Sequence, residues 1–163
     1  MNTKRSSVLA AQGIGCKTAA EIGVYQGYNA LMMIELLGLD RIYLIDPFTP
    51  FDEPSSKMGK EPGFTKNENI AREVLSRYTD RCTWIIKRSD EADIPPVDFV
   101  YIDGSHEYPN VCADIEKYYP LATKIIGGHD YLSKPGVKRA VDEFIKRNWL
   151  KLYTAKSDWY IIK

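Results

Sequence analysis

Short apolar runs alternate along this chain with longer segments in which apolar residues recur every three or four positions. A short run rich in β-branched and aromatic residues is typical of a strand, whereas a period near 3.6 predicts an amphipathic helix. The predicted strands are Lys17–Val24, Arg41–Asp46, Cys82–Arg88, Asp98–Asp103 and Lys124–Gly128. The predicted helices are Asn29–Gly38, Asn67–Asp80, Pro109–Ala122 and Gly136–Asn148.

This order of strands and helices predicts a parallel sheet with helices on both faces. The strands lack regular polar alternation, as expected for strands that are covered on both sides. The last segment, residues 150–163, predicts two strands around a Lys-Ser-Asp turn, and this hairpin adds at least one antiparallel strand. The predicted fold class is therefore α/β, a three-layer Rossmann-like sandwich. The chain of 163 residues is predicted to form one domain, 1–163.

Overall charge and cysteine content exclude several classes of protein. Lys plus Arg and Asp plus Glu both number 22, so the chain lacks the basic excess that nucleic-acid binding requires. The three cysteines, Cys16, Cys82 and Cys112, are far apart and form no C-x-x-C motif. A disulfide framework and a zinc site built on cysteine are therefore not expected.

The N-terminal apolar run does not have the form of a signal peptide. It follows Lys4 and Arg5, is short, and is interrupted by Gln12 and Gly13. No run in the chain reaches the length needed to span a membrane. We therefore expect a soluble, cytoplasmic protein without a membrane or nucleic-acid partner.

The candidate site lies where the predicted strands end. Glycine or aspartate follows five strands, at Gly23, Asp46, Asp90, Asp103 and Asp130. In open parallel sheets, ligands bind beyond the carboxyl ends of the strands. The sequence therefore predicts that these residues share one edge of the sheet and contact a ligand.

The first of these ends carries the sequence "EIGVYQG", Glu21 to Gly27. Gly23 and Gly27 would let the backbone approach a ligand closely. Tyr25 stands where dinucleotide-binding loops have their second glycine, which argues against a pyrophosphate cradle. The alternative is that the two glycines serve only a structural turn.

Asp46 and Asp90 each allow two interpretations. An acid at the end of the second strand can accept hydrogen bonds from both hydroxyls of a ribose, or Asp46 could form a turn before Pro47. Asp90 could contact a ligand, or it could cap a helix.

The sharper signal combines Asp103 with the pair His129–Asp130. Carboxylates at neighbouring strand ends can bind one hard cation such as Mg²⁺, although histidine suits a transition metal better. Alternatively, Asp103 caps the next helix and His129 is a hydrogen-bonded core residue. His106 could act as a general base, or it could be an ordinary surface residue.

Several motifs together resemble class I S-adenosylmethionine-dependent methyltransferases. They are "AAEIGVYQGYNALMM", "IYLIDPF", "VDFVYIDGSHEYPNVCADI", and "IIGGHDY" with "GVKRAVDEF". The branch that they resemble most is the small-molecule one with the I-D-G-x-H-x-Y signature, which includes metal-assisted sugar and antibiotic O-methyltransferases. The resemblance runs from about Lys17 to Phe144 and implies a seven-stranded sheet with one antiparallel strand.

The resemblance also implies roles for individual residues. Glu21, Gly23 and Gly27 would form the S-adenosylmethionine loop, Asp46 would hold the ribose, Ser89 and Asp90 would lie by the adenine, and Asp103 would also face the cofactor. Asp103, His129 and Asp130 would hold Mg²⁺ or another divalent cation, and His106 or Asp103 would remove the acceptor's proton. Metal-using relatives usually carry two carboxylates, or a carboxylate and an amide, where this chain has His129–Asp130.

The implied reaction is methyl transfer to a small molecule, at a hydroxyl oxygen or alternatively a nitrogen, by a homodimer. The long connection Pro47–Phe64, with four prolines and two glycines, would cover the substrate because the N-terminal region is short. Two alternatives stay open: a non-catalytic cofactor-binding module, and an enzyme that uses a nicotinamide or a nucleotide sugar.

Overall fold

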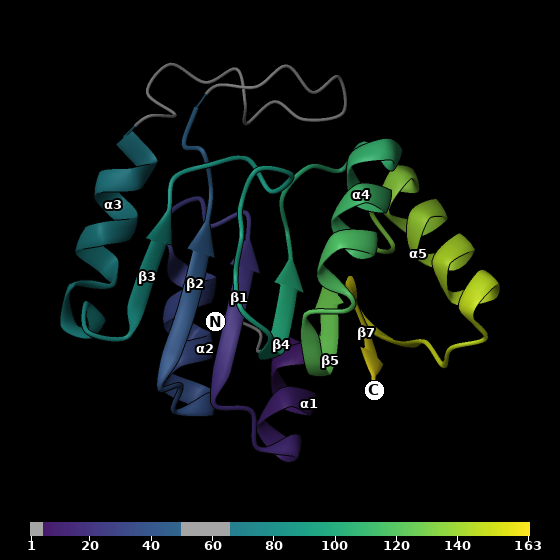
Figure 1. Cartoon of the computed structure of the whole chain (residues 1–163), viewed down its shortest axis with the longest axis horizontal. Coiled ribbons are helices and arrows are strands. Elements are labelled where there is room, and N and C mark those ends of the chain that lie inside the picture. The colour runs from purple at the N-terminus through teal and green to yellow at the C-terminus, as the bar shows by residue number, and fades with distance from the viewer. Residues whose placement is uncertain (1–4, 50–65) are drawn as a thin grey trace.

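A seven-stranded sheet forms the middle layer of the computed structural model, which describes residues 5–49 and 66–163 (Figure 1). The strands are β1 (Thr18–Ile22), β2 (Arg41–Ile45), β3 (Cys82–Ile85), β4 (Val97–Ile102), β5 (Ala122–Gly128), β6 (Tyr153–Ala155) and β7 (Asp158–Ile162). The helices are α1 (Ser6–Ile14), α2 (Tyr28–Leu37), α3 (Lys66–Val74), α4 (Tyr108–Tyr118) and α5 (Pro135–Asn148), with a short 3₁₀ turn at Ser76–Tyr78. None of the helices in these two ranges is long and apolar enough to cross a membrane.

The strand order is β3-β2-β1-β4-β5-β7-β6. Strands β1 to β5 are parallel, whereas β7 is antiparallel to both of its neighbours, β5 and β6. The predicted fold class is confirmed, including the seven strands and the antiparallel strand from the C-terminal hairpin.

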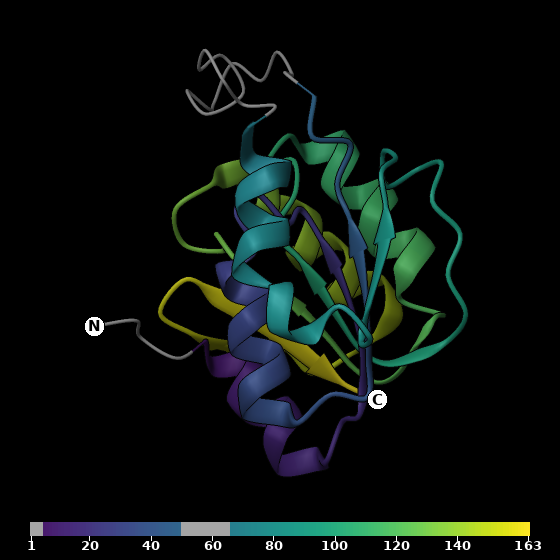
Figure 2. The same cartoon turned by 90° about the vertical axis from the view of Figure 1, so that its left-hand side faces the viewer.

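Successive strand residues pack on opposite faces of the sheet, which explains the continuous apolar runs. Phe99 packs on the side of α1, α2 and α3, while Val100 faces α4 and α5. Figure 2 shows the two helical layers on either side of the sheet. Both faces are thereby buried, as expected for a parallel sheet.

Three features differ from the sequence-based prediction. Helix α1 was not predicted, because its buried apolar residues are only Val8 and Ala11 and its N-terminus depends on a distant aspartate described below. The helix predicted over Asn67–Asp80 ends at Val74. The strand predicted over Cys82–Arg88 ends at Ile85, and residues 86–96 form no helix that Asp90 could cap. The predicted cover Pro47–Phe64 falls almost wholly outside the described residues and stays a prediction.

Candidate active site

The strand order reverses between β1 and β4, and the two strand ends meet there. The Asp103 N–H donates to the Ile22 carbonyl at 2.7 Å, and the Gly23 N–H donates to the Ile45 carbonyl at 2.9 Å. Gly23 has a φ of 88°, and a Cβ at this position would lie 2.3 Å from the Asp103 carbonyl oxygen. Only glycine fits this junction, and such a reversal point is where open α/β sheets bind ligands.

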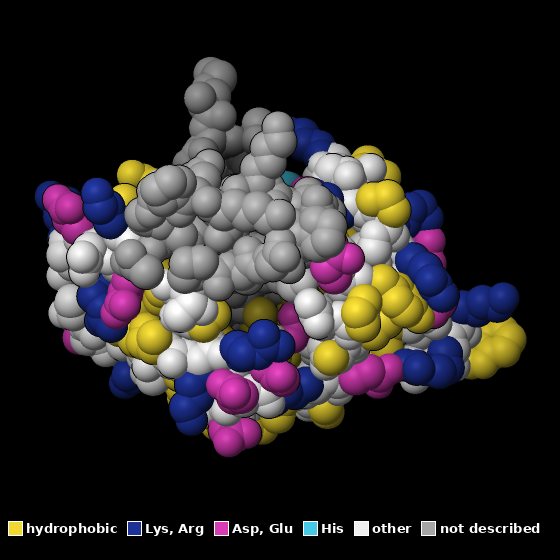
Figure 3. Space-filling model, turned by 90° about the horizontal axis from the view of Figure 1, so that it is seen from above, with side chains coloured by type: hydrophobic (Ala, Val, Ile, Leu, Met, Phe, Trp, Pro, Cys, Tyr) yellow, Lys and Arg dark blue, Asp and Glu magenta, His cyan; other side chains and the backbone are white. Residues whose placement is uncertain are grey.

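A cleft of about 760 Å³ lies at this edge of the sheet. Figure 3 looks onto this edge, where acidic and basic side chains border a hollow. Nine of the predicted site residues line the cleft: Glu21, Gly23, Asp46, Ser89, Asp90, Asp103, His106, His129 and Asp130. Gly27 does not line it; a Cβ on Gly27 would lie 3.2 Å from Ala71, so this glycine lets α2 and α3 approach each other.

Glu21, in β1, carries a buried carboxyl group at the floor of the cleft. The side chain is 1% exposed, and its Oε1 accepts a hydrogen bond from Asn29 Nδ2 at 2.7 Å. Glu21 Oε2 and Asn29 Oδ1 are buried, and neither has a hydrogen-bond partner among residues 5–49 and 66–163. Burial raises the pKa of Glu21 to about 8, although the hydrogen bond from Asn29 lowers it. Because both residues line the cleft, Asn29 Oδ1, and Glu21 Oε2 once the carboxyl group is ionised, are placed to accept hydrogen bonds from a ligand.

Asp46 ties together the turns that follow β1 and β2. Its Oδ2 accepts hydrogen bonds from the Val24 and Tyr25 N–H groups at 2.9 Å, and its Oδ1 accepts one from the Phe48 N–H at 2.8 Å. Tyr25 and Phe48 have φ values of 51° and 48°, a strained conformation that these bonds stabilise. Burial raises the pKa of Asp46, and the three hydrogen bonds oppose that rise.

A carboxylate has about four acceptor positions, and Asp46 uses three of them. That Asp46 receives both ribose hydroxyls stays a prediction. Its Oδ1 can accept one further hydrogen bond.

The far end of the cleft is formed by the loop after β3 and by α4. The Ser89 carbonyl accepts a hydrogen bond from the Tyr118 hydroxyl at 2.7 Å. Asp90 is exposed and pairs with Arg88 at 3.1 Å; it caps no helix, because residues 89–91 form a turn. Asp114, from α4, is 4% exposed, and burial raises its pKa to about 6 despite a hydrogen bond from Ser89.

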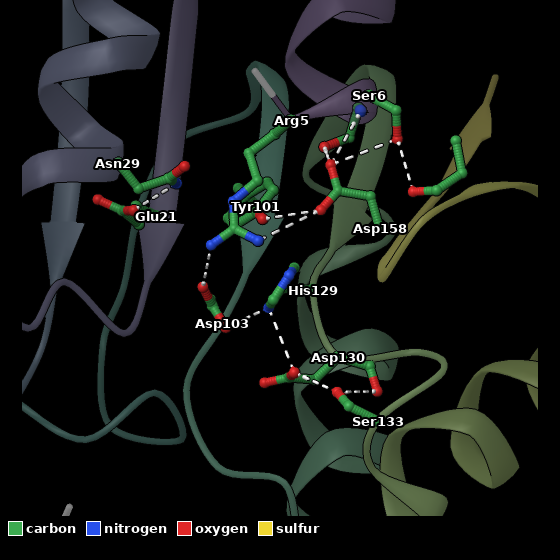
Figure 4. A network of polar contacts seen from close by, with 12 residues as sticks. Arg5, Ser6, Glu21, Asn29, Tyr101, Asp103, His129, Asp130, Ser133 and Asp158 are labelled. Atoms are coloured by element: carbon green, nitrogen blue, oxygen red, sulfur yellow. Dashed lines mark hydrogen bonds and ion pairs between the residues drawn. The ribbon is translucent and has the colours of Figure 1, made fainter. Parts of the chain in front are cut away.

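Asp103, His129 and Asp130 gather at the ends of β4 and β5 (Figure 4). His129 Nδ1 lies 3.9 Å from Asp103 Oδ1 and 3.3 Å from Asp130 Oδ1, and His106 Nε2 lies 2.9 Å from Asp130 Oδ2. One potential ligand atom from each of Asp103, His129 and Asp130 lies within 4.8 Å of the other two. Donors on opposite sides of one cation lie about 4–5 Å apart, so this donor set fits a single divalent cation.

The two carboxyl groups of this cluster differ electrostatically. Burial raises the pKa of Asp103, while His129 and Arg5 oppose the rise. Burial also raises the pKa of Asp130, but hydrogen bonds from His106, His129 and Ser133 outweigh it and hold that pKa well below the usual range. Asp103 does not cap α4, because Glu107 occupies the N-cap position of that helix.

Sequence reasoning missed four residues of this region: Arg5, Asn29, Asp114 and Asp158. Asp114 could have been found, because it interrupts the apolar face that Val111, Ile115 and Tyr118 present on α4. Arg5 and Asp158 carry no local signal. They meet only because α1 packs against β7 (Figure 4).

A family model described as a methyltransferase domain (Methyltransf_24) matches residues 20–131. No curated protein matches the chain.

Three of the solved structures that share the fold are O-methyltransferases. The O-methyltransferase NovP has a TM-score of 0.72 and 17% identity, over 98% of this chain and 77% of that chain. The O-methyltransferase TomG from Streptomyces achromogenes, in complex with SAM, has a TM-score of 0.68 and 14% identity, over 96% of this chain and 77% of that one. An O-methyltransferase from Bacillus cereus, in complex with SAH, has a TM-score of 0.62 and 18% identity, over 96% of this chain and 78% of that chain. At these identities, the likeness concerns the fold.

Proposed function

Because this chain belongs to the methyltransferase domain family, whose model spans residues 20–131, we propose that it transfers the methyl group of S-adenosylmethionine to a hydroxyl oxygen of a small molecule. The solved O-methyltransferases of the same fold support the choice of oxygen. The balanced charge of the chain supports a small acceptor over a nucleic acid.

The observation that carries this proposal is the pair of unpartnered oxygens on Glu21 and Asn29. Within the described residues, three buried side-chain atoms lack a hydrogen-bond partner, and two of them are these oxygens at the cleft. A carboxyl oxygen of Glu21 and the neighbouring amide oxygen of Asn29 together suit a ligand ammonium, such as that of the methionine moiety. The ionised carboxylate would bind it by a charge-assisted hydrogen bond.

The rest of the cleft can hold the remainder of the donor. Asp46 Oδ1 would accept a hydrogen bond from one ribose hydroxyl. Ser89, Asp90 and Asp114 lie on the side of the cleft formed by the β3 loop and α4, where the adenine would bind. The sulfonium carries an activated methyl group, so the protein mainly needs to align donor and acceptor.

The proton of the acceptor would pass to His106, which hydrogen-bonds the low-pKa carboxylate of Asp130. That carboxylate would stabilise the imidazolium as it forms. Asp103, His129 and Asp130 would hold a divalent cation, and a bound cation lowers the pKa of a coordinated hydroxyl and orients it.

The experiment that tests the proposal is calorimetric titration with S-adenosylhomocysteine, with NAD as the control ligand. We expect binding of S-adenosylhomocysteine in the micromolar range and none of NAD. Binding of NAD alone, or of neither by folded protein, would contradict the assignment. Transfer of a labelled methyl group to a panel of hydroxylated compounds then distinguishes an enzyme from a module that only binds the donor.

Replacing Asp46 with alanine should weaken S-adenosylhomocysteine binding by about 1.5–3 kcal/mol, because a charged acceptor is lost. The variant should also unfold at lower temperature, since three backbone N–H groups lose their acceptor. Calorimetry below the unfolding range separates the two effects. Unchanged affinity in folded Asp46→Ala protein would rule out a direct contact between Asp46 and the ligand.

A further inference from the structure

Arg5 brings a fixed positive charge into the cleft from the N-terminal end of α1. The residue occupies the N-cap position of this helix, and its side chain lines the cleft. One guanidinium nitrogen lies 3.8 Å from Asp103 Oδ2, and another lies 3.7 Å from Asp158 Oδ1 (Figure 4). Arg5 therefore links the end of β4 to the C-terminal hairpin.

Asp158 restricts the guanidinium to this place. It is 3% exposed, and its Oδ2 accepts hydrogen bonds from the Ser7 N–H at 3.2 Å and the Ser7 hydroxyl at 2.9 Å. The Tyr101 hydroxyl donates to its Oδ1 at 3.4 Å. These contacts hold the N-terminus of α1 on β7, so the position of Arg5 depends on the packing of that helix.

Each of the two carboxylate oxygens of Asp103 thus faces a different position for a cation. Oδ1 lies on the side of His129, with which Asp103 and Asp130 form the candidate metal site. Oδ2 lies on the side of Arg5. A unit charge about 4 Å from a carboxylate lowers the affinity of that carboxylate for a second cation, because the two positive charges repel.

We propose that Arg5 is a built-in counter-ion of Asp103 that competes with a divalent cation, so that the docking of α1 sets the metal affinity of the cleft. The proposal rests on the proposed active site, and it concerns how that site is regulated. While Arg5 stays against Asp103, part of the negative charge of the cluster is neutralised without metal. A divalent cation binds tightly only when the guanidinium moves away or is absent.

The test is titration of the whole chain with Mn²⁺ alone, followed by the paramagnetic resonance signal of the free ion. Arg5→Gln should bind Mn²⁺ about tenfold more tightly than the unchanged protein, and Arg5→Lys should stay close to the unchanged protein because it keeps the charge. Arg88→Gln is the matched control. It removes an arginine from the same cleft, but one that pairs with Asp90, and it should leave the affinity unchanged.

Two further measurements make the result decisive. Asp103→Asn should weaken Mn²⁺ binding in both the unchanged and the Arg5→Gln backgrounds, which locates the ion at the cluster. Equal Mn²⁺ affinity for Arg5→Gln and the unchanged protein would overturn the proposal, as would the absence of Mn²⁺ binding in both. Titration of each variant with S-adenosylhomocysteine shows separately whether the proposed donor site itself holds.

Discussion

Replacing Glu21 with glutamine should stabilise the unliganded protein by about 3 kcal/mol at pH 7. The native state keeps a proton on Glu21 up to about pH 8, whereas the ordinary pKa of this group is 4.5. Between these values, the unfolded state releases a proton that the native state retains. The free energy of unfolding therefore falls by about 1.4 kcal/mol for each pH unit over this range. Glutamine resembles the protonated acid but does not ionise in the unfolded chain, so it avoids this loss.

The same substitution should weaken S-adenosylhomocysteine binding by about 1.5–3 kcal/mol, because the ammonium would lose a charged acceptor. In the unchanged protein, pairing with the ammonium requires ionised Glu21. Binding near neutral pH should therefore release a proton, and this release should be absent in Glu21→Gln.

Urea unfolding between pH 5 and pH 8 measures the change in stability. Calorimetry in buffers of different ionisation enthalpy measures the affinity and the proton release on binding. Glu35→Gln is the matched control, because it removes a carboxylate from an exposed position on α2. If Glu21→Gln and Glu35→Gln showed the same pH dependence of stability, the buried acid would not be the cause.

Replacing Gly23 with alanine should cost about 3–5 kcal/mol of stability and remove donor binding. The added Cβ would lie 2.3 Å from the Asp103 carbonyl oxygen and 2.7 Å from the Gly104 Cα, so β1 and β4 would have to separate. The φ of 88° adds strain for any residue with a side chain. A loss of this size is a large part of the stability of a typical domain.

Gly13→Ala is the matched control for this change. Gly13 lies in α1, and in the described part of the chain nothing beyond its own helix backbone and sequence neighbours would come within 4 Å of its added Cβ. Alanine should therefore stabilise the protein by about 0.5–1 kcal/mol through helix propensity. Thermal unfolding compares the two variants, and a Gly23→Ala protein as stable as the unchanged chain would disprove the close approach.

Much of the fold could be predicted because its strands are strongly apolar over a short distance. The predicted segment Arg41–Asp46 contains β2, and the predicted segment Asp98–Asp103 contains most of β4. Both strands are covered on two faces of the sheet, and this burial explains why their sequences are so apolar. Helix α1 could not be predicted in the same way. Its N-terminus is held by Ser7, which hydrogen-bonds Asp158, a residue 151 positions further along the chain.

The candidate site was predictable where it follows from topology. The carboxyl ends of parallel strands must lie on one edge, so Asp46, Asp103 and Asp130 were placed correctly at the cleft. Gly27 was predicted there as well, but it does not line the cleft, and its added Cβ would lie 3.2 Å from Ala71 of α3. A glycine signal alone does not distinguish contact with a ligand from contact with another helix.

The sequence by itself determined the order of the elements from β1 onward, the doubly covered sheet and the chemical character of its binding edge, because these depend on local hydrophobicity and on the direction of the strands. Only the tertiary structure decided how the charged groups are paired. It left Glu21 and Asn29 with free oxygens, used three acceptor positions of Asp46 on the backbone, and set Arg5 against Asp103. Burial and pairing depend on distances between segments far apart in the chain, and these distances are a property of the packed molecule.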